Sequence, residues 1–116
     1  MTNQEYINLE EGLNRVRGNK NLFLRMLQMF LNSKEFVELE EQLANAKYDQ
    51  AAETAHAIKG MTGNLSLIQL FETSTTLMNQ LRNGSADTEL IDQYHDVLFT
   101  TRSEVEKLCI QLKTEV

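Results

Sequence analysis

One histidine and one lysine in this sequence have the spacing that chemistry on a helix surface requires. His56 and Lys59 lie three residues apart within residues 55–65, so a helix places both side chains on one face. A neutral imidazole nitrogen is a nucleophile near neutral pH. The ammonium group of a lysine offsets the charge of an anion held nearby. The pair therefore indicates a surface where an anionic group lies beside a nucleophilic nitrogen.

Two glycines accompany this pair on the same predicted face. At about 100° per residue, Gly60 and Gly63 lie within roughly 60° of His56. A glycine inside a helix costs about 1 kcal/mol relative to alanine, so two on one face need a physical reason. We interpret them as clearing space for a partner that approaches the imidazole. The predicted docking surface also includes Ala52, Asn64 and apolar residues of the preceding helix.

Regular apolar spacing predicts the helices that hold this face. Spacings of three and four between apolar residues are typical of amphipathic helices. The predicted helices cover residues 9–16, 21–43, 50–64, 67–82 and a last stretch that begins at Asp87 or Thr88. The predicted core stripe of the third of these is Ala51, Ala55, Ile58, Thr62 and Leu65. That of the fourth is Leu67, Phe71, Ser74, Met78 and Leu81.

Turn and capping residues predict where these helices begin and end. Gly18 suits the left-handed residue that often ends a helix. Asn32 and Ser33 are expected to bend or break the long second helix, because their side chains compete for backbone hydrogen bonds. Asp49 is the predicted N-cap of the helix that carries His56.

Length and composition indicate the fold class. The chain has 116 residues and no proline. At about 100–150 residues per domain, this length allows one domain, which we assign to residues 1–116. Because proline breaks helix interiors, its absence favours a chain that is nearly all helix. We predict an all-α fold, an up-down-up-down antiparallel four-helix bundle with a short extra N-terminal helix.

Charge and cysteine content exclude several classes of partner. The formal net charge is −6 and no basic tail is present, which argues against nucleic acid. The apolar runs are far shorter than the ~20 residues of a membrane span. Cys109 is the only cysteine, so it has no partner for a disulfide within the chain, and a reducing compartment is expected. We expect a cytoplasmic monomer that binds neither nucleic acid nor membranes.

The segment around His56 resembles the histidine-containing phosphotransfer (HPt) domain. In that family a lysine follows the histidine by three residues and a glycine follows it by four, as Lys59 and Gly60 do here. Small residues come next in the family, and Gly63 and Asn64 match them. The resemblance extends to the N-terminal region and covers most of the chain. The chain is similar to the stand-alone, single-domain type.

The resemblance implies a four-helix bundle that carries a phosphoryl group. His56 would accept this group from the aspartyl phosphate of one receiver domain and pass it to another receiver. Lys59 would partly offset the phosphoryl charge. An amide of the neighbouring helix, Asn79 or Gln80, would orient the imidazole, which adds Gln80 to the expected partner-binding residues.

The resemblance also implies the partners and the cofactor requirement. The partners would be receiver domains of response regulators and of hybrid histidine kinases. The carrier would hold no cofactor or metal of its own, and Mg²⁺ is expected on the receiver. The sequence has no glycine-rich phosphate loop followed by Lys-Ser or Lys-Thr. We therefore expect a phosphoryl carrier without its own ATP site and not an enzyme.

Two positions depart from the family's pattern. Met61 stands where serine or alanine is common, and it falls toward the flank of the core, which indicates packing. Ser66 stands where a glycine is common near the end of the helix. This second departure bears on the local turn geometry and leaves the nucleophile unchanged.

Two alternative functions are open at this point. A helical adaptor would bind signalling partners without carrying phosphate. A metal site is the other, because Glu53 with His56 and Asp92 with His95 have the carboxylate-x-x-His spacing of dinuclear iron sites in some bundles. Such ligands must face inward, whereas Glu53 lies outside the predicted core stripe, which disfavours a metal site.

Overall fold

The chain folds into helices throughout the part that the structure describes. The structure is a computed structural model and describes residues 6–115. Its helices are α1 (Leu9–Arg15), α2 (Lys20–Leu31), α3 (Glu35–Ala44), α4 (Tyr48–Asn64), α5 (Ile68–Arg82) and α6 (Thr88–Glu115). No strand occurs among these residues. The prediction of an all-α fold is confirmed.

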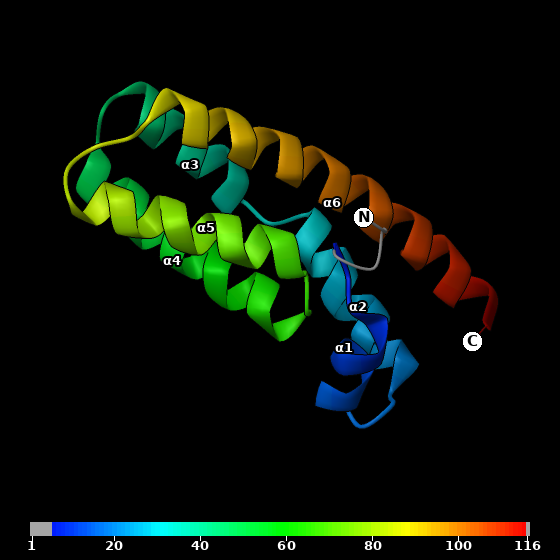
Figure 1. Ribbon diagram of the computed structural model, residues 1–116. Helices are drawn as coiled ribbons and strands as arrows, with labels where there is room; N and C mark the ends of the chain where they lie inside the picture. The colour runs from blue at the N-terminus through cyan, green and yellow to red at the C-terminus, as the bar shows by residue number, and fades with distance from the viewer. Residues whose placement is uncertain (1–5, 116) are drawn as a thin grey trace.

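The helices pack side by side and form a helical bundle (Figure 1). α3 packs against α4, α4 against α5, and α5 against α6. α6 meets α3 where Nε2 of His95 lies 2.9 Å from the carboxylate of Glu40. α2 packs along the C-terminal part of α6, and α1 packs on α2 at the same end of the molecule. Residues 6–115 thus form six helices, one more than the four-helix bundle with an extra helix that we predicted.

The additional helix arises because the long second helix is interrupted at Asn32 and Ser33. The side-chain amide of Asn32 donates to the carbonyl four residues earlier, at 2.9 Å. Oγ of Ser33 accepts from the backbone N–H of Glu35, the first residue of α3, at 3.3 Å. Nη2 of Arg102 donates to the carbonyl of Leu31 at 3.0 Å, which satisfies one of the free carbonyls at the end of α2. The expected break between α2 and α3 is confirmed.

The helix that carries His56 begins earlier than predicted. α4 starts at Tyr48, and the residue before it, Lys47, makes no side-chain capping hydrogen bond. The chain turns just before, where Ala46 has φ +54. Because the turn ends at Lys47, Asp49 already lies in the first turn of the helix, and its prediction as N-cap is wrong. Its carboxylate still suits the partial positive charge at the helix N-terminus.

Two other predicted helix boundaries are confirmed. Gly18 follows α1 with φ +76, the left-handed conformation that glycine adopts without strain. α6 begins at Thr88, where Oδ1 of Asp87 accepts from the backbone N–H of Glu89 at 3.1 Å. At these two positions, the turn and capping residues in the sequence are sufficient to predict the helix boundary.

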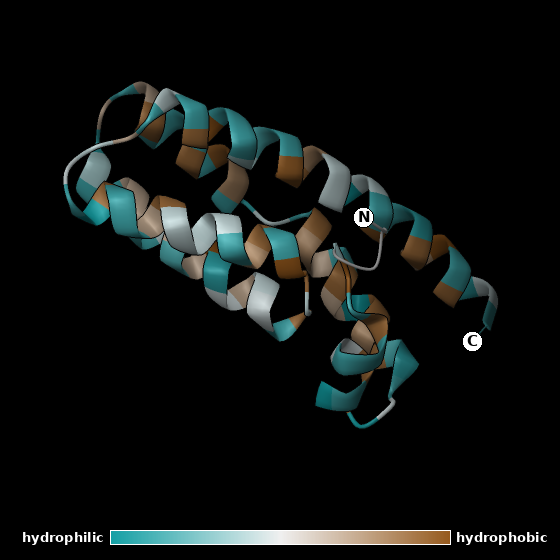
Figure 2. Ribbon diagram, viewed as in Figure 1, coloured by the Kyte–Doolittle hydropathy of each residue, from teal (hydrophilic) through white to brown (hydrophobic). Residues whose placement is uncertain are grey.

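The core lies between the facing sides of the helices, where apolar segments repeat along each helix (Figure 2). The predicted core stripe of α4 is buried as expected. Its exposed fractions are 0% for Ala51, 1% for Ala55, 0% for Ile58, 0% for Thr62 and 2% for Leu65. Within residues 6–115, no helix has both the length and the apolar composition that crossing a membrane requires.

Candidate functional site

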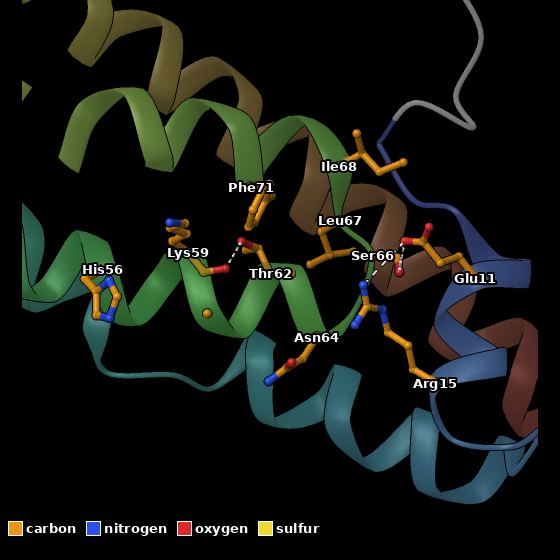
Figure 3. A pocket seen from close by; sticks show the side chains of 12 residues that line it. Glu11, Arg15, His56, Lys59, Thr62, Asn64, Ser66, Leu67, Ile68 and Phe71 are labelled. Carbon is orange, nitrogen blue, oxygen red and sulfur yellow. Dashed lines mark hydrogen bonds and ion pairs between the residues drawn. The ribbon is translucent and has the colours of Figure 1, made fainter. Parts of the chain in front are cut away.

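His56 lies in the middle of α4 with its ring exposed to solvent. No hydrogen bond of its side chain is found among residues 6–115. The ring borders a hollow of about 380 Å³ between α4, α5 and α1, which we call the His56 hollow (Figure 3). Its lining residues are Glu11, Arg15, His56, Lys59, Gly60, Thr62, Gly63, Asn64, Ser66, Leu67, Ile68 and Phe71. The imidazole is therefore accessible from solvent and unconstrained by a polar neighbour in this part of the chain.

Lys59 lies one helical turn after His56 and borders the same hollow. Its side chain is half-buried, and its ammonium lies over the ring of Phe71, with Nζ 6.0 Å from the ring centroid. This distance is at the outer limit of a cation–π contact. The arrangement places a positive charge at the edge of the hollow next to the histidine, as the spacing in the sequence predicts.

The two glycines of this face have different surroundings. Apart from backbone of its own helix, no heavy atom of the described residues lies within 4 Å of a Cβ built at Gly60. A Cβ at Gly63 would lie 3.2 Å from two ring carbons of Phe71. Gly60 thus leaves open space beside His56, in agreement with its interpretation as clearing space for a partner. That interpretation is wrong for Gly63, which instead allows the Phe71 ring of α5 to pack against α4.

Ala52 does not belong to the exposed face. It is 4% exposed and forms part of the core, so its placement on the docking surface is wrong. The reason is that α3 packs along α4 in addition to α5, so the buried arc of α4 is wider than its predicted stripe. Asn64, in contrast, is exposed and lines the His56 hollow.

Gln80 is engaged at the end of α5 and not at the imidazole. Its side-chain carbonyl accepts from the backbone N–H of Asp87 in the turn that leads into α6. Among residues 6–115, no hydrogen bond joins Gln80 or Asn79 to His56. The expectation that Gln80 orients the imidazole is therefore not met, because the α5–α6 turn uses this amide. The assignment of Gln80 to the partner-binding residues stays a prediction.

Comparison with known proteins decides the family. A family model described as Hpt domain matches residues 25–115. The chain belongs to the Hpt domain family. Hpt domains are phosphocarrier modules that act in two-component relays and interact with receiver domains. Neither the curated proteins nor the solved structures contain a match to the chain.

Both departures from the family pattern have a structural explanation in this Hpt domain. Met61 is half-buried and packs against the core, as predicted. Ser66 has φ +56, the left-handed conformation that explains why glycine is common there. Oγ of Ser66 donates to Oε1 of Glu11 at 2.7 Å, and its carbonyl accepts from the N–H of Asn8 at 2.9 Å. These bonds tie the α4–α5 turn to the N-terminal segment.

α1 contributes to the His56 hollow although it precedes the residues that match the Hpt family. A Cβ at Gly12 would lie 2.8 Å from the ring of Phe23 on α2, so this glycine permits the close approach of the two helices. Glu11 and Arg15 of α1 then line the far end of the hollow, 3.9 Å apart. Sequence reasoning missed these two residues, because their helix is distant from α4 in the chain.

Phe71 is another residue of the hollow that the sequence did not indicate as part of the site. Its position in the apolar spacing of α5 predicted a place in the core, whereas the ring is only half-buried and borders the hollow. The signal that could have identified it is Gly63, because a glycine inside a helix also permits the close approach of a ring from a neighbouring helix.

A second, mostly apolar hollow adjoins the first at Asn64. It is lined by Met26, Met29, Phe30, Met61, Asn64 and Leu65, and we call it the methionine hollow. Met29 is 71% exposed, which is unusual for a large apolar side chain. Apolar residues of α2 thus lie next to the histidine face.

The residues considered for a metal site are far from forming one. His95 pairs with Glu40 between α6 and α3, and His56 is exposed on α4. Within residues 6–115, no three side chains of the histidine, cysteine, aspartate and glutamate types form a group that could hold a metal ion.

Proposed function

We propose that this Hpt domain carries a phosphoryl group on His56 between two receiver domains. The observation that supports the proposal is the exposed imidazole of His56 with the Lys59 ammonium one turn away, both bordering one hollow. Nothing in the described chain covers the histidine, so an acidic receiver pocket has access to it.

The first transfer moves the phosphoryl group onto the carrier. A ring nitrogen of His56 attacks the phosphorus of an aspartyl phosphate on the first receiver. The N–P bond forms as the P–O bond to aspartate breaks, and the aspartate leaves as a carboxylate. The other ring nitrogen carries the proton of the neutral imidazole and can release it to water. In the second transfer, the other ring nitrogen takes a proton back from water and an aspartate of the next receiver attacks the phosphorus. The P–O bond to that aspartate forms as the N–P bond breaks, and the imidazole leaves neutral.

Charge neutralisation is the main contribution this chain makes beyond the nucleophile. Phosphoryl transfer depends chiefly on positioning and on electrostatic stabilisation. Lys59 supplies one positive charge near the transferred group, and the receiver supplies the divalent cation and the acidic pocket. The open space over Gly60 allows that pocket to reach the imidazole.

The proposed docking surface combines the histidine face with the adjoining apolar hollow. Gly60, Gly63 and Asn64 form its part on α4. The methionine hollow adds flexible apolar side chains, which adapt to partner surfaces. We also infer that the domain spans residues 1–116 and acts in the cytoplasm. We infer that it is a monomer, since copies with a charge of −6 repel one another.

The test is a transfer assay with a matched histidine control. The protein is incubated with a phosphorylated receiver, and the label is expected to be acid-labile and alkali-stable. His56→Gln should abolish it, whereas His95→Gln should retain it, because His95 pairs with Glu40 away from the hollow. Label that persists in His56→Gln would overturn the assignment. Receiver binding without label would favour the adaptor function.

Lys59 is expected to assist transfer without being essential to it. Lys59→Ala should slow transfer or shorten the lifetime of phosphohistidine by about fivefold, which corresponds to the ~1 kcal/mol of an exposed charge pair. Lys107→Ala, which removes an exposed lysine of α6, is the control and should leave both unchanged. An equal effect of the two substitutions would contradict a local role for Lys59.

A further inference from the structure

The ammonium of Lys59 has an aromatic neighbour and, among residues 6–115, no carboxylate partner. Its Nζ lies 6.0 Å from the centroid of the Phe71 ring. The four ion pairs found among residues 6–115 all involve other side chains. The Lys59 ammonium therefore lies near the Phe71 ring, and none of these ion pairs prevents it from binding an anion.

The ring of Phe71 packs against Gly63, a glycine that we had expected to clear space for a partner. A Cβ at Gly63 would lie 3.2 Å from Cδ1 and Cε1 of Phe71, closer than nearly all real contacts of this kind. The absence of this Cβ lets the ring lie against α4, with the Lys59 side chain next to it (Figure 3). A glycine in the last turn of α4 thus fixes the place of an aromatic ring on α5.

A fixed ring limits where the lysine can place its charge. A lysine side chain has several rotatable bonds, and an unrestrained ammonium would sample many positions. A ring face attracts the cation and restricts these positions before any anion binds. If the ammonium is already ordered before the receiver binds, less conformational entropy is lost when the reacting complex forms.

We propose that Phe71 is a positioning residue, whose ring, seated against Gly63, holds the Lys59 ammonium beside His56 for the incoming phosphoryl group. The role in transfer rests on the proposed function. The contact between ring and ammonium can be tested without any phosphate.

The first measurement concerns the unphosphorylated protein. Protons over an aromatic face shift upfield in the ¹H NMR spectrum, so the ε-methylene of Lys59 should show such a shift. Phe71→Leu should remove the shift, and Phe71→Tyr should retain it, because tyrosine keeps the ring. Phe99→Leu is the matched control on α6, where Phe99 is 77% exposed. An unshifted Lys59 ε-methylene in the wild-type protein would overturn the proposal.

The second measurement is a double-mutant cycle on transfer to His56. Phe71→Leu should slow transfer or shorten phosphohistidine lifetime by about two- to fivefold, the equivalent of ~0.5–1 kcal/mol for an exposed cation–π contact. Phe71→Tyr should recover most of the loss. In a Lys59→Ala background, Phe71→Leu should have no further effect, because it acts through the lysine.

The outcomes separate this inference from the function on which it rests. If the wild-type protein accepts no label on His56, the proposed function is wrong, and with it the role in transfer. If the wild-type protein is labelled but Phe71→Leu transfers at the wild-type rate, only the positioning role is wrong. The same holds if the loss in Phe71→Leu is equally large without Lys59, since a merely structural effect of the ring would behave in that way.

Discussion

At the scale of single residues, Gly60 and Gly63 show how the same residue type on one helix face meets different constraints. Gly60 borders open space, whereas Gly63 faces the ring of Phe71. On the helical wheel both lie on the side of His56, and only the position of α5 distinguishes them. Their stability effects should therefore differ.

Alanine substitutions measure this difference. Gly60→Ala should stabilise the protein by about 0.5–1 kcal/mol, because alanine loses less backbone entropy in a helix. Gly63→Ala should gain less or be destabilising, since its Cβ would meet the ring at 3.2 Å. Urea unfolding followed by circular dichroism measures both free energies. Equal stabilisation would show that the ring moves aside freely.

Ser66 supports a second prediction at this scale. It combines a left-handed conformation, φ +56, with a hydrogen bond to Glu11. Ser66→Ala keeps the strain and loses the bond, whereas Ser66→Gly loses the bond but removes the strain. The glycine variant should be about 1 kcal/mol more stable than the alanine variant, from the usual cost of this conformation for residues with a Cβ. Denaturant unfolding of both variants is the measurement, and a more stable alanine variant would contradict the account.

At the scale of elements, α4 presents its accessible face where α3 and α5 leave it uncovered. A bulky side chain on that face should block docking without disturbing the bundle. Gly60→Phe is the suitable change because a Cβ there meets open space. We expect a loss of transfer of at least tenfold with unchanged helix content, measured with a phosphorylated receiver and by circular dichroism. Gly63→Phe would be unsuitable, since it would collide with Phe71 and disturb the contact between α4 and α5.

The contacts of α1 belong to this scale as well. Glu11 and Arg15 reach the His56 hollow only because Gly12 lets α1 approach α2 and because Ser66 binds Glu11. No local pattern in residues 9–15 indicates this placement. The apolar spacing predicted that a helix forms there, and the tertiary contacts decide which surface it borders.

At the scale of the whole molecule, α6 connects the bundle to the α1–α2 end. Cys109 lies in this part of α6 and is 5% exposed, which supports the interpretation of its thiol as packing. Burial raises the pKa of the Cys109 thiol, and Glu106 adds to the effect while Lys113 opposes it. Both the burial of the thiol and its smaller thiolate fraction should slow the reaction of Cys109 with alkylating reagents.

Alkylation of Cys109 therefore reports on the packing of α6. With iodoacetamide at pH 8, the native protein should react at least tenfold more slowly than the protein in denaturant. The native rate should also rise at higher pH than that of a free thiol, because the raised pKa shifts thiolate formation upward. Mass spectrometry over time gives both rates. Equal rates would mean that this part of α6 opens readily.

The sequence by itself determined the helices, most of their boundaries and the reactive pair. These features depend on local spacing: apolar periodicity, turn residues, and a histidine and lysine three residues apart. The errors arose where a distant segment acts on a local one. Ala52 is buried in the core, Gln80 binds the backbone of the α5–α6 turn, and the turn at Ala46 sets the start of α4.

Only the tertiary structure decided what surrounds the histidine. The packing of the helices gives Gly60 and Gly63 their different surroundings. It also places the Phe71 ring beneath Lys59 and brings α1 to the His56 hollow. A helical wheel gives the direction of each side chain from its own axis. It does not give the direction from which neighbouring helices approach, and that approach determines which side chains remain accessible to a partner.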